Sequence, residues 1–164
     1  MTLLVDFCQW LNDLPPSQTL AQSEWAFPIV ESVHVLALGL VAGTVALVDL
    51  RVLGLALGEI RLTAIARRLL PLTWGGFAVM ALSGGALFAS EAVKLSHNPL
   101  FQLKLVLLLL AGLNAWIFHA TVYRRVAVWE QAAVAPAQAR VAAITSLATW
   151  TAIIIAGRFI AYVH

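Results

Sequence analysis

The chain has 164 residues, of which 62% are hydrophobic and only 11% are charged. Soluble domains are about 45–50% apolar and roughly 25% charged, so much of this protein's surface must face something other than water. The net charge of +2 is small and the basic residues form no stripe, so nucleic acid is not an expected partner. A single cysteine, Cys8, excludes an internal disulfide and a cysteine-based metal cluster.

Residues 1–25 are expected to form a short amphipathic helix and a linker. Polar residues lie opposite a run of apolar residues at helical spacing, which comprises Leu3, Leu4, Phe7, Trp10, Leu11 and Leu14. Such a helix can lie in the outer membrane interface, or it can pack its apolar face against the rest of the protein. Both interpretations remain open, and Pro15-Pro16 is expected to end the helix.

Four later segments each supply the roughly 20 mostly apolar residues that a transmembrane helix needs. The predicted helices cover about 26–50, 69–90, 100–122 and 141–163. Continuous apolar runs of this length do not show the alternation of a membrane barrel. The sequence therefore predicts an all-α fold, with an integral membrane four-helix bundle over residues 26–164 and a short N-terminal interfacial helix.

Glycines are concentrated in the first two predicted spans, at Gly39, Gly43, Gly75, Gly76, Gly84 and Gly85. Small residues at such positions allow close helix packing. They can also make room for a flat cofactor.

The loops differ in positive charge. The arginines gather after the first and third predicted helices, at Arg51, Arg61, Arg67, Arg68, Arg124, Arg125 and Arg140. The opposite side holds only Lys94. The positive-inside rule places the arginine-rich loops in the cytoplasm, so we expect a bacterial inner-membrane protein with both termini in the periplasm. The lipid bilayer is the expected partner, and whether a second copy or a redox protein also binds stays open.

Ionisable residues inside the spans indicate where function is to be sought, because each costs about 2.5–3.5 kcal/mol or more to insert. At 1.5 Å per residue, they fall into two layers. The outer layer holds Glu31, His34, Lys104 and Arg158; the inner layer holds Asp49 and His119, with Asn114 as a further polar residue.

The faces that carry these residues on the first and third predicted helices are expected to point at each other. An ion pair of Glu31 with Lys104 or Arg158 can then form in the outer layer, and an Asp49–His119 pair in the inner layer.

Structural roles are open for the same residues. Lys104 and Arg158 can extend to the headgroups, and Asp49 can pair with Arg51 at the interface. Asn114 can serve only as a helix–helix hydrogen bond.

His34 is the most informative residue, because it lies too deep for a loop histidine. A neutral imidazole ligates haem iron and relays protons, and it can also hydrogen-bond Glu31, three residues earlier. His34 and His119 are separated by roughly 18 Å along the membrane normal, so they cannot ligate one haem together.

Several sequence strings resemble an uncharacterised family of small bacterial four-helix inner-membrane proteins. They are Trp25–His34, Asp49-Leu-Arg51, Arg67–Pro71, Asn98–Lys104, Asn114 and Gly157-Arg158. The resemblance covers nearly the whole chain and implies the four-helix topology.

A more distant resemblance rests on His34, Arg51, Arg67-Arg68 and Lys104. These positions are similar to those of the membrane protoporphyrinogen oxidases that use haem b, and of the copper-resistance D domain. The resemblance implies that His34 is a haem ligand, and that Lys104 binds a haem propionate or an anionic substrate.

Three hypotheses follow. The first is a haem b redox protein whose iron is bound by His34 and whose propionates or anionic substrate are held by Lys104 and Arg158. The second is a proton, ion or small-solute transport component, and the third is a non-catalytic membrane subunit. Whether the protein is an enzyme stays open.

Overall fold

A computed structural model describes residues 2–130, 132 and 134–162, and every regular element in those residues is helical. Four helical stretches are long and apolar enough to cross a membrane. The all-α prediction is confirmed, and the protein is a multi-pass membrane protein. The predicted end of the last span at residue 163 lies outside the described residues.

The spans are built on four long α-helices, which are α3 (Ala26–Val52), α4 (Leu62–Ser90), α6 (Pro99–Ile117) and α8 (Ala137–Phe159). Asn98 caps α6, because its side-chain oxygen accepts from the backbone N–H groups of Leu100 and Phe101. Short helical turns prolong α6 beyond Ile117, in the order η1 (Phe118–Val122), η2 (Tyr123–Arg125) and α7 (Val126–Trp129). The turn η3 (Ile160–Tyr162) ends α8.

Helix α4 begins at Leu62 rather than near residue 69. Hydropathy alone starts this span after Arg67-Arg68. The helix begins earlier, because Leu62 and Ile65 are buried on its inner face. Glu130 fixes this end, since its carboxylate accepts hydrogen bonds from the Thr63 backbone N–H at 3.2 Å and from the Thr63 hydroxyl at 2.8 Å.

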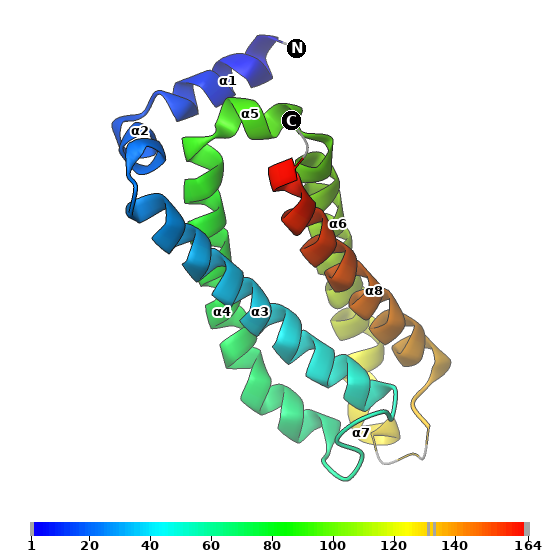
Figure 1. Ribbon diagram of the computed structural model, residues 1–164. Coiled ribbons are helices and arrows are strands. Elements are labelled where there is room, and N and C mark those ends of the chain that lie inside the picture. Colours follow the sequence, from blue (N-terminus) through cyan, green and yellow to red (C-terminus); the bar gives the residue numbers. More distant parts are fainter. Residues whose placement is uncertain (1, 131, 133, 163–164) are drawn as a thin grey trace.

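The four long helices form two pairs (Figure 1). Helix α3 packs along α4, and α6 packs along α8. The two pairs meet chiefly where α3 contacts α8, and they diverge toward the end of the molecule that carries both termini. In the described residues α3 does not pack extensively against α6, so their polar faces make no extensive direct contact, and that these faces point at each other across the bundle stays a prediction.

Three short helices close the end where the pairs diverge (Figure 1): α1 (Thr2–Asn12), α2 (Pro15–Gln22) and α5 (Ala92–His97). Helix α1 lies against α5, and Cys8 is buried. The apolar side chains Leu3, Leu4, Phe7 and Trp10 remain exposed. Helix α1 therefore contacts the protein and still presents an apolar face that suits the membrane interface.

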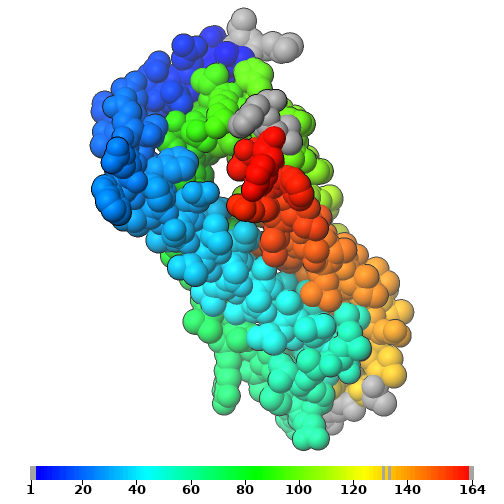
Figure 2. Space-filling view, in the orientation of Figure 1, coloured from blue at the N-terminus to red at the C-terminus, as the bar shows by residue number. Residues whose placement is uncertain are grey.

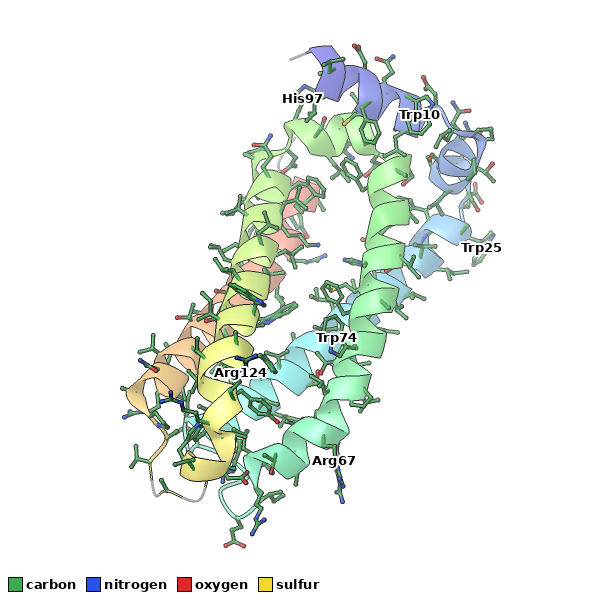
Figure 3. All side chains as sticks on the ribbon, turned by 180° about the vertical axis from the view of Figure 1, so that it is seen from behind. Trp10, Trp25, Arg67, Trp74, His97 and Arg124 are labelled. Carbon is green, nitrogen blue, oxygen red and sulfur yellow. The ribbon has the colours of Figure 1, made fainter. Side chains whose placement is uncertain are left out.

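The opposite end holds the main apolar cluster, built on Val52, Leu62, Val126, Ala139 and Ala143. Figure 3 labels Arg67 and Arg124 toward this end, and Trp10 and His97 at the other. We call the end with the termini the outer end and the arginine-rich end the inner end. Elsewhere many large apolar side chains are exposed, as expected for helices in lipid.

Candidate functional site

His34 is held in place by the neighbouring helix α4. Its Nδ1 lies 3.1 Å from the Met80 carbonyl oxygen and 3.1 Å from the Ser83 hydroxyl oxygen. The Ser83 hydroxyl donates to the Val79 carbonyl at 2.6 Å, so its oxygen is an acceptor toward His34. Nδ1 is therefore the protonated nitrogen, and the lone pair lies on Nε2, which has no hydrogen-bond partner among the described residues.

Gly84 makes room for the imidazole ring. A Cβ atom on Gly84 would lie 2.8 Å from Cε1 of His34 and 3.2 Å from Nδ1. Gly76 plays the same part for Val41, at 3.0 Å. These two glycines therefore serve close packing of α3 against α4, whereas Gly39, Gly43, Gly75 and Gly85 have no such neighbour within 4 Å.

Lys104 occupies the matching place in the other helix pair. Its side chain is partly buried, and a Cβ atom on Gly157 of α8 would lie 3.6 Å from its Nζ. Because Gly157 lies beside Lys104, the next residue, Arg158, is at the same depth. Its guanidinium donates to the Tyr162 hydroxyl at 3.2 Å and lies 5.5 Å from the centre of that ring.

The space between the two helix pairs is open in the outer half. Figure 2 shows an opening between the outer part of α3 and the end of α8. His34 belongs to α3 in one helix pair and Lys104 to α6 in the other. That these two residues share a depth stays a prediction. We call this space the outer opening.

The ion pairs considered from the sequence are not formed. The one ion pair among the described residues joins Lys94 to Glu91, at 3.1 Å. Glu31 is exposed and pairs with neither Lys104 nor Arg158 there, and Asp49 pairs with neither His119 nor Arg51. Glu31 is also not the partner of His34, whose hydrogen bonds go to α4.

In the inner layer, Asp49 and His119 differ in burial and in their hydrogen-bond partners. Asp49 is buried between α3 and α8 beside Ser146, whereas His119 is exposed and its Nδ1 bonds to the Ala115 carbonyl of its own helix at 2.8 Å. Asn114 makes a helix–helix hydrogen bond, since its Nδ2 donates to the Ala142 carbonyl at 3.0 Å. Asn114 thus makes the helix–helix hydrogen bond that the sequence offered as its structural role.

The described residues hold no group of three His, Cys, Asp or Glu side chains that could bind a bare metal ion. The candidate cofactor-binding side chains are therefore one imidazole from α3, one ammonium from α6 and one exposed guanidinium from α8, whose described hydrogen bond goes to Tyr162. This set can provide one axial ligand and two cationic contacts to a planar, anionic cofactor.

Sequence reasoning missed two groups that shape the site, which are the Met80 carbonyl and Ser83, and it missed Ser146 beside Asp49 in the inner layer. A backbone carbonyl leaves no mark on a sequence pattern. Ser83 was visible as a hydroxyl directly before Gly84 in an apolar helix, and this adjacency could have singled it out.

Neither a search of curated proteins nor a search of solved structures found a match to the chain. A family of unknown function does match residues 25–163, which include all four long helices and the groups around the outer opening. The chain thus belongs to the family of unknown function DUF6644.

Proposed function

We propose that this membrane protein binds one haem b in the outer opening, and that His34 would be a ligand of the iron. The observation that carries the proposal is the hydrogen bond from His34 Nδ1 to the Met80 carbonyl, at 3.1 Å, with Nε2 left without a partner in the described residues. Histidines that ligate metals usually donate the other ring N–H to a carbonyl or carboxylate, which fixes the tautomer and the ring orientation.

The surroundings of His34 favour the neutral imidazole that ligates iron. The side chain is half-buried, and burial disfavours a positive charge on the ring. Gly84 and Ser83 hold the ring against α4. Helix α4, rather than Glu31, is the positioning element.

Lys104 and Arg158 would hold the two propionates, or the carboxylates of an anionic substrate. Both lie at the depth of Gly157, and neither has a carboxylate partner among the described residues. Cationic side chains without such a partner are suited to charge-assisted hydrogen bonds to carboxylates. A bound haem would supply a one-electron redox couple, and His34, Lys104 and Arg158 would orient it.

We further propose that the outer end faces the periplasm of a bacterial inner membrane. Both termini lie at this end (Figure 1), and the arginine-rich connections lie at the other. The excess of arginine marks the cytoplasmic side, so the haem would lie on the periplasmic half of the bilayer.

The test is the visible spectrum of the protein purified in detergent from cells well supplied with haem, oxidised and then reduced with dithionite. We expect a Soret band that shifts on reduction, in about one equivalent per chain. The band should be lost in His34→Ala. His97→Ala is the matched control and should keep it, because His97 is an exposed histidine whose Nδ1 bonds to Val93 of its own helix. A folded protein with a featureless spectrum, which also takes up no added haemin, would overturn the proposal.

A further inference from the structure

Asp49 is a buried carboxyl group that lacks a full set of partners. It is 8% exposed, and its Oδ2 atom has no hydrogen-bond partner in the described part of the chain. Its polar neighbour is the hydroxyl of Ser146, which is itself 8% exposed on α8. An ionised carboxylate in such a place would carry a buried charge with one oxygen unsatisfied.

No ion pair with a cation compensates this charge among the residues that the structure describes. Arg51, two residues away, directs its Nε to the Ile60 carbonyl oxygen at 2.7 Å. The elements around this end of α3 carry further titratable side chains, which are Glu59, Arg61, Arg67, Arg68, His119, Tyr123, Arg124, Arg125, Glu130 and Arg140. All of these except Tyr123 and Glu130 are exposed. Tyr123 packs on the apolar cluster, Glu130 accepts hydrogen bonds from Thr63, and none forms an ion pair with Asp49 within the described ranges.

We propose that Asp49 is a proton-binding site inside the membrane, whose carboxyl group carries a proton and exchanges it with the inner aqueous side. Protonation removes the buried charge, and the O–H group of the neutral acid can donate a hydrogen bond to a nearby oxygen. Asp49 lies three residues before the end of α3 at Val52, which is roughly 5 Å along the helix axis. It lies about 22 Å from His34 by the same measure, so the exchange route leads inward.

The position of Asp49 gives the proton a structural consequence. Helices α3 and α8 form the main contact between the two helix pairs, and Asp49 and Ser146 lie within it. Loss of the proton would place a bare negative charge in this contact. The protonation state of Asp49 would then bias how firmly the pairs hold together below the outer opening. This inference stands whether or not haem is bound.

The test uses the full-length protein in lipid nanodiscs at neutral pH. Dicyclohexylcarbodiimide is apolar and reacts with protonated carboxyl groups, so peptide mass spectrometry is expected to find the label on Asp49. The exposed Asp6 and Asp13 are internal controls that should stay unlabelled. Asp49→Asn, whose amide resembles the neutral acid in shape, should fold and lose the label, and Asp49→Glu should keep it.

Infrared spectroscopy on the same sample shows whether Asp49 is protonated and whether it exchanges its proton. The wild type minus Asp49→Asn spectrum should contain the C=O stretch of a protonated carboxylic acid, which shifts in D₂O and vanishes reversibly in alkaline buffer. The absence of this band at neutral pH would overturn the proposal, whatever the labelling shows. A band that does not shift in D₂O would also overturn it, because it would indicate a locked acid that exchanges no proton.

Discussion

The imidazole of His34 lies directly against Gly84, so closely that a Cβ atom on Gly84 would come within 2.8 Å of its Cε1 atom. Real side chains do not tolerate this distance, so any larger residue at 84 must displace the ring. The same ring is tied to α4 through the Met80 carbonyl. One histidine of α3 is therefore positioned almost wholly by a single turn of α4.

Gly84→Ala should be about 1–3 kcal/mol less stable than Gly85→Ala, the cost of inserting a methyl group into a filled space. Both changes add the same helix propensity, but a Cβ on Gly85 meets nothing within 4 Å. Unfolding in detergent compares the two variants. Haem affinity should fall only for Gly84→Ala, because only that change moves His34. Equal behaviour of the two variants would show that the contact does not position the ring.

Lys104→Met should weaken haem binding by at least about tenfold, since a hydrogen bond to a charged group is worth ~1.5–3 kcal/mol. Lys94→Met is the control, because Lys94 is exposed on α5 and paired with Glu91. Haemin titration of the purified apoprotein, followed at the Soret band, gives both affinities. An unchanged affinity in Lys104→Met would remove Lys104 from the site.

Lys104→Met and Glu31→Gln should have additive effects on the free energy of unfolding, to within ~0.3–0.5 kcal/mol. The reason is that Glu31 is exposed and forms no ion pair with Lys104 among the described residues. A double-mutant cycle measured by chemical denaturation in mixed micelles checks this. A coupling energy of 1 kcal/mol or more would show that the two residues interact after all.

The stabilisation that the Glu130 carboxylate provides should be lost in acid. The Thr63 backbone N–H, and then the Thr63 hydroxyl, lower the pKa of the Glu130 carboxyl from its ordinary value of 4.5. The stabilisation is therefore complete above that value, and it is lost as the pH falls through the lowered pKa. Glu130→Gln should melt at a lower temperature than wild type at neutral pH. On acidification its melting temperature should fall less than that of wild type.

The control for Glu130 is Glu59→Gln, an exposed glutamate in the connection between α3 and α4. Its melting temperature should follow that of wild type at every pH. If Glu130→Gln and wild type have the same acid dependence, the cap on Thr63 does not contribute to stability.

The number and approximate places of the spans could be predicted because hydropathy over about 20 residues is a strong signal. The start of α4 at Leu62 could not, since it depends on Glu130, which is far away in sequence. Which helices pack against each other also could not be predicted from the sequence. A polar face on α3 shows that it needs a partner, but not that α4 binds His34 and α8 covers Asp49.

For the candidate site, the sequence singled out His34, Lys104 and Arg158 by their cost in a membrane, and it predicted a common depth for them by counting residues. It could not identify the partner of His34, because that partner is a backbone carbonyl. The glycines were seen, but only the structure assigns Gly84 to the imidazole and leaves Gly85 without a neighbour.

The most direct test of the haem proposal is rescue of His34→Gly by free imidazole. The variant, purified without imidazole and mixed with haemin, should lack the wild-type Soret and reduced bands, whereas added imidazole should restore them by occupying the vacated space beside Gly84. His97→Gly should bind haem normally throughout. If His34→Gly has the wild-type spectrum without imidazole, His34 is not the iron ligand and the proposal is wrong.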